Sequence, residues 1–205
     1  MSGSVTFNPY ATTQGANTFL SQTQGYIQGL ALDDPASNPW LVGGILATTE
    51  TVVLWGGVPI EEFINNLGTG SEGLGPTIKR STSQATTTGW SVFNKAASMV
   101  IGPGNGVPVA GTGNYASFFR NGSNARIGVQ CDPALVAALN STTSILGEAL
   151  YWDVTNYRVT LTTTGGNFAL PTSIKFLSVN TNSKIVSYAN SAATWSTGDV
   201  AIIQI

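Results

Sequence analysis

The chain has 205 residues and a net charge of −2, and only 9% of its residues are charged although 42% are hydrophobic. Soluble domains carry roughly 25% charged residues, so we expect much of this surface to be covered by other molecules; an ordinary polar but uncharged surface is the alternative. The chain has no histidine, and its single cysteine, Cys131, can form neither a disulfide nor a paired-thiolate site within one chain, which excludes the commonest redox and metal chemistry.

Residues 1–28 predict a long extended N-terminal arm. No charged side chain precedes Asp33, and the segment shows neither a helical period nor sustained alternation. Such a segment cannot build a core of its own, and when extended it could reach on the order of 90 Å. Its isolated aromatic residues favour an arm that becomes ordered along another subunit over a free terminus. The expected anchors are Phe7, Tyr10, Phe19 and Tyr26.

The body is predicted to span residues 29–205. Two glycine pairs thirteen residues apart, at 43–44 and 56–57, lie within apolar strand-like pieces and predict a bulge or a close approach of two backbone segments. Residues 59–68 predict a short helix, because a proline and two acids stand in the first turn and a glycine follows the last apolar residue. Residues 68–89 are expected to form a loop-rich insertion.

The middle of the chain predicts two strands and one helix. The strands are expected at residues 90–93 and 98–101, and the glycine-rich stretch 102–113 is left as either hairpin turns or a loop. The helix is expected at residues 132–139, where Asp132 can cap the first turn and proline follows it.

From residue 147 onward the pattern is that of strands. A turn at 155–156, a hairpin loop at 180–183 and a turn at 196–199 are expected to separate them. The last strand is apolar on both faces, so we expect it to lie inside a sheet and to complete a barrel or sandwich. The four strands are predicted at residues 157–162, 175–179, 184–188 and 200–205. The predicted class is therefore mainly β: an antiparallel β-barrel or sandwich with one or two short helices.

No motif predicts catalysis or a bound cofactor. The glycines at 68–73 match a dinucleotide-binding pattern but follow a predicted helix instead of a strand. The adjacent acids at 33–34 and at 61–62 point in diverging directions. A hydrolase that joins distant carboxylates, such as Asp153 with Glu148, stays open beside the interpretation of these acids as solvated charges or caps. We expect no enzyme activity, no cofactor, no metal and no small-molecule substrate.

The five tryptophans allow two interpretations. Trp90, Trp152 and Trp195 would line a sugar-binding face if they were exposed on one side of a sheet. Packing in the core and at subunit contacts is the alternative, because large aromatic side chains contribute most there. Trp40 and Trp55 are expected to contact a partner from the body.

The scattered basic residues, the lack of a long apolar run and an N-terminus without a secretory signal pattern predict a protein made in a cytoplasm that binds neither nucleic acid nor a membrane. Several stretches together resemble the structural cement, or decoration, proteins of tailed-bacteriophage heads. They are GLALDD (29–34), VGGI (42–45), LWGGVPIEE (54–62), WD (152–153) and ATWSTGDVAII (193–203). The resemblance covers roughly residues 25–67 and 147–205, whereas residues 68–146 match nothing in that family.

Members of that family sit on the outside of the icosahedral shell, often as trimers, and hold capsomers together; none is an enzyme. The resemblance therefore implies a virion structural protein, made in the host cytoplasm, that forms a homotrimer and binds the major capsid protein. The mechanism would be avidity, in which several weak contacts and the arm act jointly. The alternative is a β-sandwich glycan-binding module on the virion surface, used for host adhesion.

Overall fold

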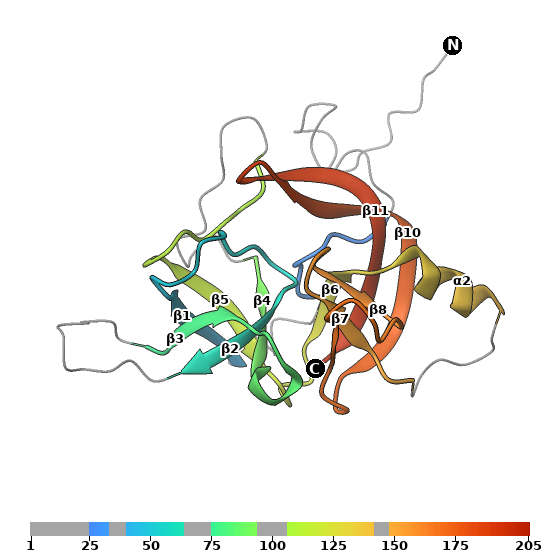
Figure 1. The fold of residues 1–205 in the computed structure, drawn as a ribbon, viewed down its shortest axis with the longest axis horizontal. Coiled ribbons are helices and arrows are strands. Elements are labelled where there is room, and N and C mark those ends of the chain that lie inside the picture. Colours follow the sequence, from blue (N-terminus) through green and yellow to red (C-terminus); the bar gives the residue numbers. More distant parts are fainter. Residues whose placement is uncertain (1–24, 33–39, 64–74, 94–105, 142–147) are drawn as a thin grey trace, which may run out of the picture.

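The computed structural model describes residues 25–32, 40–63, 75–93, 106–141 and 148–205, and they form a mainly β fold, as predicted (Figure 1). Five strands close a barrel in the order β1-β3-β2-β4-β5. They are β1 (Leu41–Leu46), β2 (Pro59–Phe63), β3 (Thr77–Arg80), β4 (Gly89–Val92) and β5 (Tyr115–Arg120). The contact between β1 and β3 is parallel and the others are antiparallel, so the barrel is mixed.

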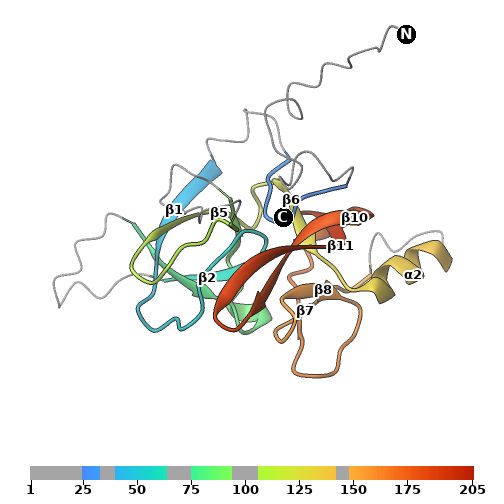
Figure 2. The same cartoon turned by 90° about the horizontal axis from the view of Figure 1, so that it is seen from above.

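Two three-stranded sheets pack beside the barrel. The first has the order β10-β11-β6 and the second the order β8-β7-β9. Their bounds are β6 (Arg126–Gln130), β7 (Tyr151–Asp153), β8 (Arg158–Thr160), β9 (Phe168–Ala169), β10 (Lys175–Ala189) and β11 (Ala192–Gln204). A 3-10 turn, η3 (Gln84–Thr86), and a helix, α2 (Pro133–Ser141), complete the described elements. Seen from above, the barrel and α2 lie at opposite ends of the molecule (Figure 2).

One continuous hydrophobic core joins the barrel to both sheets. It holds barrel residues such as Leu46 and Phe118 together with Ile127 and Ile203 of the first sheet, all of them fully buried. The barrel interior is narrow. A Cβ atom added to Gly44 would lie 2.6 Å from Cγ2 of Ile78, so the glycine makes room for that side chain. At this first glycine pair the tightest contact is with a side chain, and the strand register runs through it without a bulge, so the predicted bulge is absent here.

The predicted helix at 59–68 is wrong over its first half, where the chain forms strand β2. Glu61 lies opposite Lys79 of β3 and forms an ion pair with it, at 3.4 Å between Nζ and Oε2. Glu62 forms a two-bonded ion pair with Arg120 of β5. These partners are remote in sequence, and they override the local helix signals. Residues 64–68 and the predicted strand at 98–101 lie outside the described part of the chain. Of the insertion predicted at 68–89, residues 68–74 also lie outside it, whereas the rest contains β3, η3 and the first residue of β4 and is therefore not all loop.

Other local predictions are confirmed. Trp90 lies in strand β4, and the helix α2 begins directly after Asp132. The Asp132 carboxylate accepts a hydrogen bond of 2.8 Å from the backbone N–H of Ala134, so the aspartate caps the helix as expected.

The long hairpin of β10 and β11 differs from the prediction. The expected loop at 180–183 and the expected turn at 196–199 lie within strands, and the first of them coincides with a shift in strand register. The hairpin turns instead at Asn190 and Ser191, whose φ angles of 51° and 61° fit a tight two-residue turn. The final strand lies between β10 and β6, so its central position is confirmed. It belongs to the open sheet, however, and does not close the barrel.

Candidate partner-binding surface

Residues 25–28, which the sequence assigns to the arm, belong to the body. Together with residues 29–32 they form a segment, here called the anchor segment, that pairs with both edges of the β10-β11-β6 sheet. At one edge, Gln28 N–H donates to Lys184 O and Lys184 N–H donates to Tyr26 O, each at 2.9 Å. At the other edge, Gly29 N–H donates to Gly128 O at 2.7 Å. The chain N-terminal to residue 25 is therefore attached to the body at a fixed point.

A crossing of glycines holds the anchor segment against the barrel. A Cβ atom added to Gly56 would lie 2.7 Å from Cα of Gly29, and one added to Gly57 would lie 2.9 Å from Gly128 O. Phe93 N–H donates to Gly29 O at 2.8 Å across the same crossing. The second glycine pair thus allows the close backbone approach that its sequence predicts.

The structure describes one of the four predicted arm anchors. The Tyr26 ring packs on its own body, against a small cluster of Ile185, Val200 and Ile202, and its hydroxyl is 3.2 Å from Oγ of Ser178. Tyr26 therefore anchors the chain to itself at this position. The other three predicted anchors, Phe7, Tyr10 and Phe19, lie outside the described residues.

Trp40 is the most exposed large hydrophobic residue in the described part of the chain, with 64% of its surface accessible. It stands just before β1 and borders a hollow of about 290 Å³ formed with Val42 and the turn at residues 120–123. Within this turn, Oδ1 of Asn121 is buried and accepts no hydrogen bond, while its amide nitrogen donates to Thr87 O at 2.8 Å. We call Trp40, Val42 and residues 120–123 the Trp40 surface.

Two more exposed apolar side chains belong to the anchor segment where it pairs with β6, the strand that follows the turn at 120–123. Leu30 and Leu32 are 41% and 37% accessible, and the backbone of both is bonded to β6. Ala31 between them packs toward the core, so the two leucines face the opposite way. The Trp40 surface and these leucines offer a partner an indole ring and apolar side chains.

Trp55 is fully buried, so it cannot contact a partner as the sequence suggested. Its ring stacks on Tyr188 with centroids 5.4 Å apart and meets the edge of Tyr157 at 5.1 Å. The guanidinium of Arg80 lies 4.9 Å from its ring centroid, and burial lowers the pKa of that group although Glu50 opposes the shift. Sequence reasoning missed this cluster, because its members come from four separate segments and share no motif.

Two of the three tryptophans proposed for a sugar-binding face are buried. Trp90 and Trp152 pack edge to face with centroids 5.5 Å apart, and both are at most 2% accessible. Trp195 is half-buried and contacts Phe93. These rings fill the core and do not form a row on the surface.

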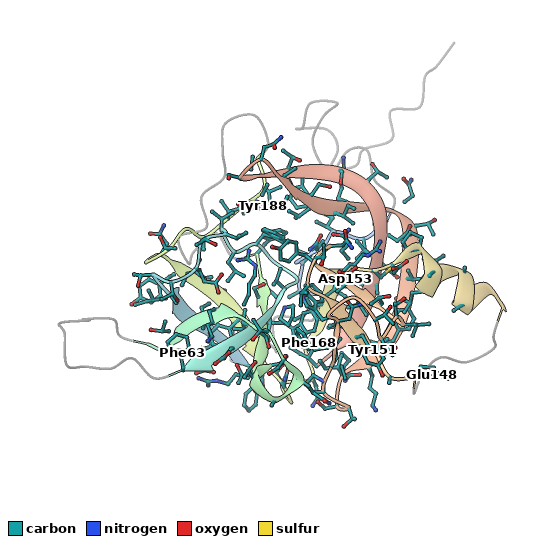
Figure 3. The ribbon with its side chains drawn as sticks, in the orientation of Figure 1. Phe63, Glu148, Tyr151, Asp153, Phe168 and Tyr188 are labelled. Carbon is teal, nitrogen blue, oxygen red and sulfur yellow. The ribbon has the colours of Figure 1, made fainter. Side chains whose placement is uncertain are left out.

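The Asp153 carboxylate serves a structural role, and Glu148 lies elsewhere. Asp153 accepts hydrogen bonds from the backbone N–H groups of Thr155 and Asn156, both at 3.0 Å. Burial works against its charged form, but these bonds and those from the Asn156 and Arg158 side chains outweigh it and hold the pKa of Asp153 below its usual value. Glu148 borders a separate hollow beside β9 and β10, apart from Asp153 (Figure 3). These two carboxylates therefore do not share a site.

Within the same described residues, no three His, Cys, Asp or Glu side chains lie close enough to hold a metal ion. Cys131 is 2% accessible, and burial, with smaller effects of Asp199 and Asp132, raises the pKa of its thiol to about 12. No helix in the described part of the chain is long and apolar enough to cross a membrane. Comparisons of the chain with protein-family models, with curated proteins and with solved structures gave no match.

Proposed function

We propose that this chain is a structural protein that binds the outside of a tailed-phage head as a homotrimer and cements contacts between capsomers of the major capsid protein. The observation that carries the proposal is the Trp40 surface, where a large aromatic ring stands in solvent next to a hollow. Exposed tryptophans of this kind are typical binding hot spots in protein–protein interfaces.

The distribution of charge supports the same proposal. Lys79, Arg80 and Arg120 of the barrel form ion pairs with acids of their own chain. Arg158 does so with Asp132 and Asp153. These side chains neutralise one another, so this part of the described surface presents little charge that would oppose burial against a neighbouring protein.

The anchor segment supports a role for the residues before it. It fixes the chain at residue 25, from which 24 more uncharged residues precede. A tether of that length raises the effective concentration of a second contact once the first has formed. Two weak contacts on adjacent capsomers then hold longer than either alone.

The test is a head-binding assay with heads that lack this protein. Full-length protein, a chain lacking residues 1–24 and the variant Trp40→Ala are mixed with heads, and the bound fraction is measured after sedimentation. We expect Trp40→Ala and the truncation each to lower the apparent affinity at least tenfold. Leu177→Ala is the matched control, because Leu177 is 39% accessible but lies on β10, away from the Trp40 surface.

Two results would contradict the proposal. If the heads bind no full-length protein at all, the capsid is not the partner. If the wild-type chain and both variants bind equally well, neither the Trp40 surface nor residues 1–24 contact the head. Sedimentation velocity of the free protein tests the trimer separately.

A further inference from the structure

An apolar hollow of about 200 Å³ opens between the end of β9, the start of β10 and the residues just before β7. Its accessible lining is mainly apolar. The exposed Ala149 and the half-buried Ala169 and Pro171 form its walls, over a floor of buried leucine, isoleucine and phenylalanine side chains. We call it the Glu148 hollow, after a residue of its rim that Figure 3 labels; it shares no residue with the Trp40 surface.

Backbone and side-chain hydrogen bonds fix the shape of the Glu148 hollow. Leu170 N–H donates to Leu150 O at 2.7 Å, which joins the two sides of the hollow. Ile174 N–H donates to Pro171 O at 3.0 Å and closes the turn that leads into β10. The side-chain amide of Gln84 donates to Leu170 O at 3.2 Å from the barrel side. A hollow held in this way needs little ordering when a side chain enters it.

The rim of the hollow carries one charge that has a partner and one that has none. Lys175 and Glu148 are both exposed at the rim. The Lys175 ammonium donates to Thr172 O at 2.9 Å. Among the described residues, no side chain forms an ion pair with Glu148. The charge that is free to bind a partner is therefore negative.

Size and charge together indicate the chemistry of the occupant. A dry apolar cavity of about 150 Å³ is large enough for benzene, so the Glu148 hollow has room for one apolar side chain. An apolar centre inside an exposed polar rim is also the usual arrangement of a contact between proteins. A lysine or arginine beside the inserted side chain would pair with Glu148, whereas an acid there would be repelled.

We propose that the Glu148 hollow is a further contact with the head, and that it receives one apolar side chain of a neighbouring protein with a basic residue beside it. This inference rests on the proposed function and extends it. The Trp40 surface and the Glu148 hollow would be two separate contact points on the folded body, in addition to residues 1–24. A molecule held at several points dissociates more slowly than one held at a single point.

The chemistry of the hollow is tested on the full-length protein with three probes that share one isopentyl group. They are isopentylamine, isopentanol and isocaproate, whose head groups are cationic, neutral and anionic. Binding is followed by NMR, from the methyl shifts of Leu170 and Ile174. We expect isopentylamine to bind with a dissociation constant on the order of millimolar. It should bind about two- to fivefold more tightly than isopentanol, since an exposed ion pair contributes modestly, and isocaproate should bind most weakly.

Two variants and one control make the result specific. Glu148→Gln removes the charge at nearly constant shape, so it should bind isopentylamine and isopentanol equally well, the latter as the wild type does. Ala149→Trp fills the hollow from its exposed wall and should weaken the binding of isopentylamine and isopentanol about tenfold or more. Ala192→Trp is the matched control, because Ala192 is an exposed alanine on β11 outside the hollow.

Head binding of the same proteins tests the source of the occupant. We expect Ala149→Trp to lower the apparent affinity for heads by about threefold or more, whereas Ala192→Trp should bind as the wild type does. If the probes bind as expected but Ala149→Trp and the wild type bind heads equally well, the hollow takes a free small cation and the proposed contact is wrong.

The probes can also overturn the proposal without heads. It fails if no probe shifts the methyl groups of the hollow, if isocaproate binds most tightly, or if Glu148→Gln keeps the preference for the amine. If heads bind no wild-type protein, the proposed function fails and the contact with the head fails with it. The probes still measure the preference of the hollow in that case, so the two failures can be told apart.

Discussion

The crossing of Gly29 over Gly56 allows a quantitative prediction about what holds the anchor segment in place. In the variant Gly56→Ala, the new methyl group would lie 2.7 Å from Cα of Gly29, 3.0 Å from its carbonyl oxygen and 3.0 Å from the backbone nitrogen of Phe93. All three are backbone atoms and cannot move aside as a flexible side chain would. The anchor segment must therefore shift away from the barrel.

The expected cost follows from two contributions. Forcing an extra methyl group into a packed site costs about 1–3 kcal/mol. The shift also weakens the bond from Phe93 N–H to Gly29 O, which contributes about 1 kcal/mol. We expect Gly56→Ala to lower the free energy of unfolding by about 2–4 kcal/mol, which corresponds to a fall in melting temperature of roughly 4–16 °C for a chain of this size.

The control is Gly43→Ala in the other glycine pair. A methyl group there meets only Cδ1 of Tyr115, at 3.9 Å, which is an ordinary contact. We expect its free energy of unfolding to lie within about 0.5 kcal/mol of the wild type, since surface substitutions away from special features usually do. Urea unfolding followed by tryptophan fluorescence measures both variants, and hydrogen exchange of the Gly29 and Gly128 amides reports on the anchor segment itself. If Gly56→Ala and Gly43→Ala prove equally stable, the crossing does not hold the segment.

Three further predictions concern the thiol, the β7–β8 turn and the hairpin. The Cys131 thiol, buried and with a pKa of about 12, should not react with a disulfide reagent at pH 8 until the protein is unfolded; rapid reaction of the native protein would contradict its burial. The pKa of Asp153 is lower in the folded than in the unfolded chain, so its contribution to stability is present above about pH 4 and is lost as the pH falls through the folded-state value. Asp153→Asn should therefore cost about 1–3 kcal/mol at pH 7 and less at pH 3, as measured by urea unfolding, and an equal cost at both pH values would refute this. Ser191→Gly should stabilise the hairpin by about 0.5–1 kcal/mol, because Ser191 has a φ of 61° that glycine adopts without strain; a lower melting temperature would show that the serine side chain matters more.

The sequence predicted the elements whose signals are local. Asp132 followed by proline marked the start of α2, and the two-faced apolar pattern of residues 200–205 marked a strand inside a sheet. It failed at residues 59–63, where Pro59 and two glutamates resemble a helix start. The ion pairs of Glu61 and Glu62 with Lys79 and Arg120 favour a strand there over a helix. Neither partner can be identified from the local sequence.

The hairpin and the tryptophans show the same limit. The asparagines at 180 and 182 look like loop residues, yet Oδ1 of Asn180 accepts a bond from Asn182 N–H at 2.9 Å inside an irregular strand. Trp40 and Trp55 both border apolar stretches, and only the packing of remote segments leaves the first in solvent and buries the second. The burial of an aromatic side chain depends on contacts that no short pattern contains.

The position of the anchor segment has a consequence for solubility. An unpaired strand edge is a template onto which a strand of another molecule can add. Many proteins prevent such aggregation by placing charged side chains on the edge strand. This chain has few charges, but the anchor segment occupies the β10 edge at Lys184 and the β6 edge at Ile127. Loss of that segment would expose both edges at once, so we expect a chain that lacks residues 1–32 to self-associate more readily than the full chain.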